Sequence, residues 1–405
     1  MPYRAGITTD KQISWRWIFW INPPIIVVST ALFVVAWPRS ENVRQHEKKG
    51  FRSLDVHGAI LLAAGCVLPV LAFQEVGSHA NAWRQGLFIG PLVAGVGSWF
   101  LLFYREFRLT HADDRVNPIF PPRLLANRRY AANAANSLLV GFLFFVAIYY
   151  VPLHMQTVNG KSPLGAGVAL LPMLGSAAFG SFLAGTLSSG MDLLCPSMVS
   201  GSALITLGCG LLSTLSDSVR VETKIYGFQV LVGLGFGLTV SSSSILANVE
   251  CELRDHAVAQ GIVAQARVFG GSFGIAAGTA ILGRKIRTHL VETGILAPSE
   301  VQSLYASVDA LSAAQLEAVR RTYANAFRET MIAAAIVGCA AFVSAIFVWN
   351  DSKIALPNRI VLQEQREDER ISKLMREKCL ATQLNGQETG SIMPLPPYQR
   401  TEGQV

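Results

Sequence analysis

The chain has 405 residues, of which 51% are hydrophobic and only 15% are charged, and its formal net charge is +7. A typical soluble domain is about 25% charged, so this composition excludes a disordered chain and argues against a soluble enzyme. An excess of Lys and Arg is typical of the cytoplasmic loops of membrane proteins, and it does not by itself indicate nucleic-acid binding.

Nine apolar runs, each with few or no charges, are long enough to cross a bilayer as helices. Their continuous apolar character favours helices over the alternating strands of a membrane barrel. The sequence therefore predicts an all-α integral membrane protein with about nine transmembrane helices. The predicted spans are 17–36, 57–76, 86–104, 135–156, 165–187, 194–214, 225–247, 260–283 and 327–349.

The distribution of basic residues predicts the orientation of these spans. Lys and Arg gather in segments 37–56 and 105–134 and in the tail after residue 349, whereas 77–85 and 157–164 each carry one basic residue. The positive-inside rule then places the basic segments in the cytoplasm and residues 1–16 outside. Three basic residues at the start of loop 284–326 depart from this rule.

Two segments outside the spans have local signals of their own. Ser299 with Gln302, and Ser312 with Gln315, fit the capping box that begins a helix. We expect Ser312–Arg328 to form an extramembrane helix that leads into the last span. The tail is predicted to hold a short cytoplasmic helix followed by a flexible end, because it is polar and rich in mixed charges.

Small residues predict where helices approach closely. The eighth run has Gly270, Gly274 and Gly278 on one face, and the seventh has Gly233 and Gly237 at the same spacing. Such spacing lets two helix backbones come into contact within lipid. It is compatible with helices that slide during transport, and also with static packing, which is the commoner case.

Four polar residues within the spans are candidates for substrate binding: Arg267, Gln265, Gln229 and Asn136. Arg267 is the one Lys or Arg deep in a predicted span, about 10 Å of helix rise from the inner end. Its charge would face a cavity or a partner, or snorkel to the cytoplasmic interface, with about equal weight. For the amides, hydrogen bonds between helices are the commoner role.

Several kinds of chemistry have no signal in this sequence. The seven histidines are scattered without metal-site spacing, the six cysteines form no C-x-x-C pair, and there is no P-loop. We therefore expect no metal, no cofactor and no ATP-driven step. No Asp or Glu lies in the middle of a predicted span, so no carboxylate stands out as a proton carrier.

Three stretches resemble a known family. Residues 6–22, with T-T-D and S-W-R-W-I-F-W-I-N, are similar to the start of the sixth helix of the fungal fourteen-spanner drug:proton antiporters of the major facilitator superfamily. Residues 148–167 are similar to the ninth helix of that family and the turn after it. Residues 257–271 resemble its thirteenth helix.

The resemblance implies a partial major facilitator fold, truncated at its N-terminus by five helices. It divides the chain into one helix of an N-terminal bundle (1–36), two linker helices with their loops (37–134), a complete C-terminal six-helix bundle (135–349) and a cytoplasmic tail (350–405). Transporters of this type move substrate between two bundles that rock against each other. We therefore expect this chain alone not to complete a transport cycle.

The leading hypothesis is a proton-coupled efflux transporter of small organic molecules, either drugs or secondary metabolites, in the plasma membrane or the vacuolar membrane. The alternatives are a non-transporting regulatory or vestigial membrane protein that associates with an intact transporter or a missing half and, less favoured, a membrane-embedded enzyme. In the tail, Leu395, Pro396 and Tyr398 fit a motif that WW domains bind, although a chance match is the commoner explanation.

Overall fold

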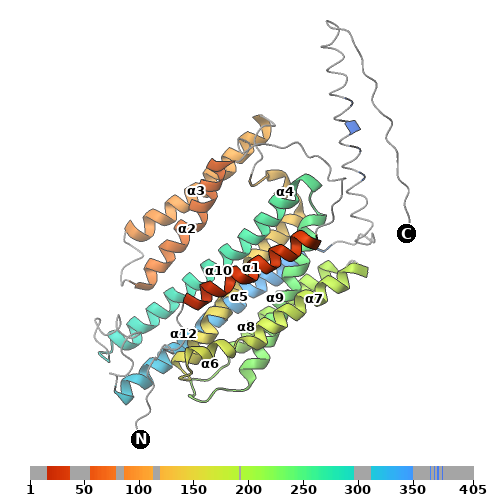
Figure 1. Cartoon of the computed structure of the whole chain (residues 1–405). Helices are drawn as coiled ribbons and strands as arrows, with labels where there is room; N and C mark the ends of the chain where they lie inside the picture. Colours follow the sequence, from red (N-terminus) through yellow and green to blue (C-terminus); the bar gives the residue numbers. More distant parts are fainter. Residues whose placement is uncertain are drawn as a thin grey trace, which may run out of the picture.

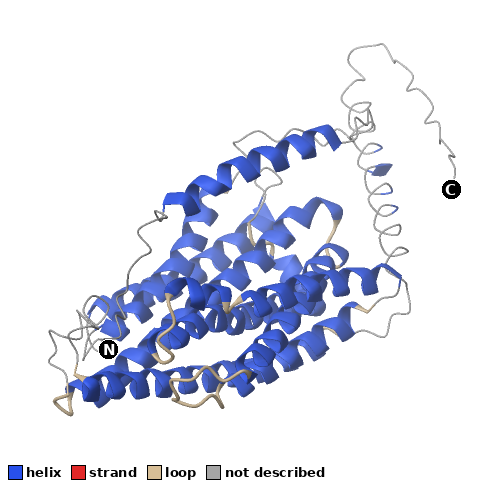
Figure 2. Ribbon diagram, turned by 60° about the horizontal axis from the view of Figure 1, so that its bottom comes forward, coloured by secondary structure: helices blue, strands red, loops and turns tan. Residues whose placement is uncertain are grey.

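The computed structural model describes residues 16–36, 55–78, 86–112, 119–190, 193–295 and 312–349, together with five single positions in the tail. These ranges contain helices and loops, and no strand (Figure 2). The helices are α1 (Arg16–Ala36), α2 (Val56–Ser78), α3 (Gly86–Ala112), α4 (Pro122–Ala126), α5 (Arg128–Thr157), α6 (Pro163–Val168), α7 (Leu171–Gly190), α8 (Leu194–Leu212), α9 (Lys224–Val249), the 3-10 turn η3 (Leu253–Asp255), α10 (His256–Ile286), the π-helical segment η4 (Arg287–Val291) and α12 (Ala313–Ile346).

Within the described ranges, nine helical segments are long and apolar enough to cross a membrane, as the sequence predicted. The fifth of them runs through α6 and α7, from Pro163 to Ser188, and the eighth includes η4. The all-α membrane fold is therefore confirmed for the described part of the chain.

Helices α5, α7, α8, α9, α10 and α12 pack into one bundle (Figure 1). Helix α5 lies against α9, α10 and α12, while α9 also packs on α7 and α8. The main core is apolar and includes the fully buried Leu143, Met155, Ile205, Val232 and Met331. The outward faces of the bundle remain apolar and exposed, as expected for surfaces that meet lipid.

Glycines bring these helices into backbone contact. A methyl group added to Gly270 of α10 would collide with the carbonyl of Leu138 on α5. The same change at Gly233 of α9 would collide with the carbonyl of Met173 on α7. The predicted close approach is therefore present in both helices, and it holds α5 to α10 and α7 to α9.

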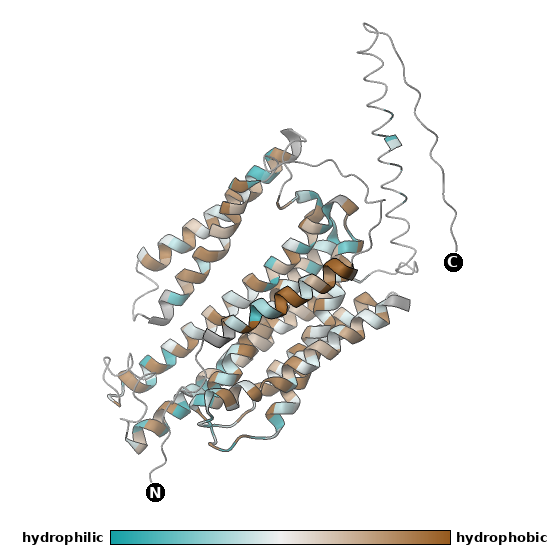
Figure 3. Ribbon diagram, viewed as in Figure 1, coloured by the Kyte–Doolittle hydropathy of each residue, from teal (hydrophilic) through white to brown (hydrophobic). Residues whose placement is uncertain are grey.

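Helices α2 and α3 form a hairpin beside the bundle and contact it through α10 (Figure 1). Phe73 of α2 packs edge-on against Phe273 of α10, with ring centroids 4.7 Å apart. Within the hairpin, the indole of Trp99 donates a 3.0 Å hydrogen bond to the carbonyl of Gly65. Helix α1 is different, because every side chain from Phe19 to Ala36 is exposed, and Figure 3 shows it as strongly hydrophobic.

Several helices are longer than the apolar runs that predicted them. Helix α5 begins at Arg128, and α10 begins at His256. The predicted lead-in helix is confirmed as the first part of the continuous α12, where Ser312 and Gln315 form the full capping box. The second predicted capping box, at Ser299 and Gln302, and most of the tail lie outside the described residues.

Candidate functional site

Asn136 is a node that joins three helices. It is fully buried on α5, and its Nδ2 donates to the carbonyl of Ala341 on α12 at 2.8 Å and to Ser202 Oγ on α8 at 3.0 Å. At the next residue of α5, Ser137 Oγ lies 2.7 Å from Ser243 Oγ on α9. The amide nitrogen of Asn136 is therefore used between helices, whereas its Oδ1 is buried without a hydrogen-bond partner in the described residues.

Gln265 lies on the side of α10 that faces the hairpin. Its side chain is exposed over much of its surface, and its Nε2 reaches Cys66 Sγ of α2 at 3.5 Å. Gln265 and Asn136 therefore face different neighbours, α2 in one case and α8 with α12 in the other. The structure does not bring these two candidates together.

Arg267 lies in the first half of α10. Since α10 begins at His256, Arg267 is about 16 Å of helix rise from the start of its helix. Its Nη2 is buried and has no hydrogen-bond partner within the described residues. Gly141 of α5 packs directly against the Arg267 backbone, which fixes this part of α10 against α5.

Gln229, like Asn136, lies in the interior of the bundle. Its side chain on α9 is fully buried, and both its Oε1 and its Nε2 lack a hydrogen-bond partner among the described residues. A buried amide without partners costs about 1–3 kcal/mol, so this position is suited to a ligand or a water molecule that supplies the missing bonds.

Buried charged residues lie together at the start of α2 and the end of α3. The sequence pattern did not predict this cluster. Asp55 and Glu106 are both buried, and Arg105 lies between the two helices with its Nη1 2.6 Å from Asp55 Oδ2. Burial raises the pKa of Asp55, but the hydrogen bonds from Arg105 and from the backbone of Gly58 outweigh it, so the pKa lies below its usual value. The apolar run ends at residue 104 and so predicts a loop at Glu106, but α3 continues through Ala112.

A second group of charges ties the bundle together at the end where α5 begins. Arg129 of α5 forms an ion pair with Glu250, just after α9, and its Nε donates to the carbonyl of Val348 at 3.1 Å. Arg123 pairs with Asp255 at 2.8 Å. These contacts join the start of α5 to the α9–α10 turn and to the end of α12, so they lock this end of the bundle.

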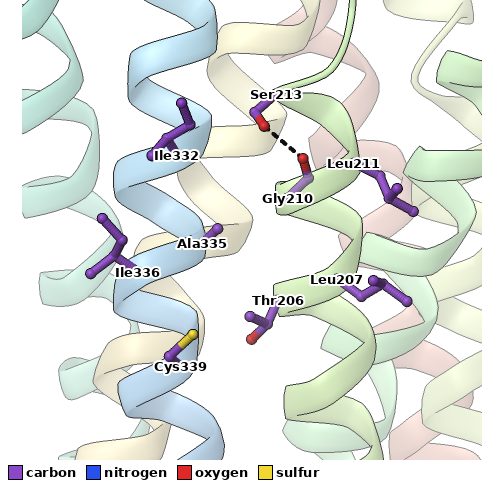
Figure 4. A pocket seen from close by; sticks show the side chains of 9 residues that line it. All are labelled: Thr206, Leu207, Gly210, Leu211, Ser213, Ile332, Ala335, Ile336 and Cys339. Carbon is purple, nitrogen blue, oxygen red and sulfur yellow. Dashed lines mark hydrogen bonds between the residues drawn. The ribbon is translucent and has the colours of Figure 1, made fainter.

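A groove of about 380 Å³ runs between α8 and α12 (Figure 4). Leu207, Ile332 and Ile336 line it together with small residues. Its two hydroxyl groups are already engaged with their own helix, since Thr206 donates to Ser202 and Ser213 donates to Gly210. The groove therefore offers an apolar surface without free hydrogen-bonding groups. No group of three or more His, Cys, Asp or Glu lies together in the described ranges.

A bundle of membrane-length helices with buried polar side chains between them is the architecture of a polytopic membrane protein. The model of the Major Facilitator Superfamily matches residues 1–275, so the chain belongs to this superfamily. Integral membrane location and a transporter family are thereby established for it.

Curated relatives are fungal proteins of the same superfamily. The MFS-type transporter FPY5 of Fusarium mangiferae is 29% identical over 344 residues, which are 82% of this chain and 57% of that protein. The aspyridones efflux protein of Neocamarosporium betae is 30% identical over 87% of this chain and 63% of its own length. The chain therefore spans about three fifths of the length of these relatives.

A solved structure is also similar to this chain. The crystal structure of a bacterial homologue of the human lysosomal transporter Spinster, in an inward-facing and occupied conformation, is 17% identical and has a TM-score of 0.42. The match covers 73% of this chain and 69% of that chain.

Proposed function

We propose that this chain takes part in the efflux of small organic molecules across a membrane. The observation that carries the proposal is the similarity of 87% of the chain to a protein named as an efflux protein. The plasma membrane is the proposed location, with the vacuolar membrane as the alternative. A transporter role, and not catalysis, is proposed because the family is one of transporters.

Within the bundle, we assign the substrate contacts to Arg267 and Gln229 ahead of Asn136 and Gln265. Arg267 Nη2 and both amide atoms of Gln229 are buried without a partner in the described residues, so a ligand that bonds to them replaces no existing contact. Asn136 Oδ1 is also buried without a partner in the described residues, but its Nδ2 makes bonds that hold α5 to α8 and α12. A half-buried guanidinium with a buried Nη2 favours a substrate with an anionic or strongly accepting group.

Binding is the direct test, because it does not require a transport cycle. The purified 405-residue chain in lipid nanodiscs is titrated with tritiated salicylate and with tritiated tetraphenylphosphonium, two small amphipathic probes of opposite charge. Saturable binding that favours salicylate supports the proposal. Equal and non-saturable uptake of both probes into chain-bearing and empty nanodiscs contradicts it.

Transport itself is proposed to need more than these helices. Superfamily transporters move substrate between two bundles, and the described residues contain one bundle, a hairpin and α1. The purified chain in proteoliposomes is therefore expected to show no sustained proton-dependent efflux of salicylate. Sustained efflux would show that the chain suffices.

A further inference from the structure

His154 is a buried titratable group that none of the contacts described above explains. It lies in the last turn of α5, is 5% exposed, and has no hydrogen-bond partner for Nδ1 in the described part of the chain. On one side, its ring centroid is 4.5 Å from that of Phe327 on α12. The imidazole is therefore held in place by α12, while one of its nitrogens remains available.

A small cavity lies on the other side of His154, beneath the loop 213–223 that joins α8 to α9. Its lining includes His154 and five residues of that loop, of which Ser216, Arg220 and Glu222 are polar. The cavity volume is about 10 Å³, which is close to the space that a single water molecule needs. A water there would have the imidazole nitrogen and loop polar groups as partners. The loop is the lid of this cavity.

Glu222 is the acidic residue in the cavity lining, and its charge favours a protonated imidazole, whereas burial of the ring opposes it. Glu222 is already engaged by Lys224, 2.7 Å away, and by Ser216 Oγ. These hydrogen bonds hold the pKa of Glu222 below its usual value, so it stays ionised and paired with Lys224. Arg220 is the other charged group in the lining.

The loop also carries Asp217, outside the cavity lining, and two basic residues lie near the end of α5. In the turn after α5, Lys161 donates to the hydroxyl of Tyr226 at 3.1 Å. On α12, Arg320 lies beside Gly160, close to the end of α5. A charged imidazole in the closed cavity would lose its water and gain no free carboxylate, which is costly.

We propose that His154 is a proton-binding site that controls the loop 213–223, which is closed over the neutral imidazole and opens when the imidazole is protonated. Histidine suits this role because it changes charge between pH 5 and 8 when water reaches it. Protons are then the ligand of this site, and the loop is the element that responds. The proposal does not depend on the identity of the transported molecule.

Hydrogen–deuterium exchange of the loop tests the proposal on the intact chain in nanodiscs. Exchange of residues 213–223 is measured at pH 7.5 and pH 5 and normalised to the same peptide in the unfolded chain, which removes the intrinsic effect of pH. The wild-type loop is expected to exchange at least about tenfold faster at pH 5 than at pH 7.5. A tenfold change in loop opening corresponds to a difference of one pKa unit between the closed and open states of the imidazole.

Matched variants decide whether His154 is responsible. His154→Gln keeps a hydrogen-bonding side chain that does not titrate, and its loop is expected to exchange equally at both pH values. His289→Gln removes an exposed histidine of η4 and is expected to behave as wild type. An equal pH response in His154→Gln and wild type, or no response in wild type, overturns the proposal.

A second measurement covers the case in which His154→Gln does not fold. Nitrogen-15 NMR of histidine-labelled wild-type chain reports the protonation of each imidazole. The His154 ring is expected to become charged over the same pH range in which the loop opens. A His154 ring that remains neutral while the loop opens overturns the proposal.

Discussion

Arg105 and Asp55 join the two ends of the α2–α3 hairpin: Arg105 Nη1 lies 2.5 Å from Oδ1 and 2.6 Å from Oδ2 of Asp55. The Asp55 side chain is fully buried, whereas that of Arg105 is 27% exposed. The backbone N–H of Gly58 also donates to Asp55, at 2.8 Å. The carboxylate therefore closes the hairpin and caps the first turn of α2.

Asp55→Asn is expected to destabilise the hairpin by about 3 kcal/mol, the lower end of the cost of breaking a buried ion pair, because Arg105 retains access to water. The measurement is thermal unfolding of the purified chain in detergent. Arg108→Gln is the control, since Arg108 is exposed on the same helix. Equal unfolding temperatures for Asp55→Asn and wild type would refute the role assigned to this pair.

The same pair predicts a pH dependence. The pKa of Asp55 in the folded chain is below its usual value, while an unfolded Asp titrates near about 3.9. Its contribution to stability is therefore fully present above about pH 5 and is lost as the pH falls through the folded pKa. Unfolding temperatures measured from pH 7 to pH 3 should fall less in Asp55→Asn than in wild type. Parallel curves would contradict the prediction.

Gly270→Ala is expected to disturb the contact between α5 and α10, because its methyl group would meet the carbonyl of Leu138. Overpacking of this kind costs about 1–3 kcal/mol. Gly261→Ala on the same helix is the matched control, since a methyl group there meets nothing within 4 Å. Size-exclusion profiles and unfolding temperatures of the two variants are compared, and indistinguishable behaviour would show that α10 can shift freely.

The thiol of Cys251, in the turn between α9 and α10, is expected to react slowly with maleimide. Burial raises its pKa to about 12, so little thiolate is present at neutral pH. In a variant that retains only Cys251, maleimide labelling at pH 7.5 should be at least about tenfold slower in the folded chain than after unfolding in SDS. Equal rates would mean that this turn is open to solvent.

Hydropathy predicted the spans because each span is a continuous apolar run, and the helices follow those runs. It placed the helix ends less well, since charged residues such as Arg105 and Glu106 end a run although the hydrogen-bonded helix continues. The capping box at Ser312 was readable because it depends on local sequence alone.

Side-chain partners could not be predicted in the same way. The bonds of Asn136 reach residues 66 and 205 positions away, and His154 meets a loop and a helix that are distant in the sequence. Only packing decides which polar group keeps its partners and which is left with none. The WW-domain motif at Leu395, Pro396 and Tyr398 lies outside the described residues and stays a prediction.

We propose above that the bundle holds a substrate through Arg267. The most direct measurement is the binding of tritiated salicylate to wild type, Arg267→Ala and Arg284→Ala in nanodiscs, where Arg284 is an exposed arginine of the same helix. Loss of a charge-assisted contact of about 1.5–3 kcal/mol weakens binding by at least about tenfold in Arg267→Ala, while Arg284→Ala binds as wild type. Equal affinity in all three well-folded proteins would contradict the claim.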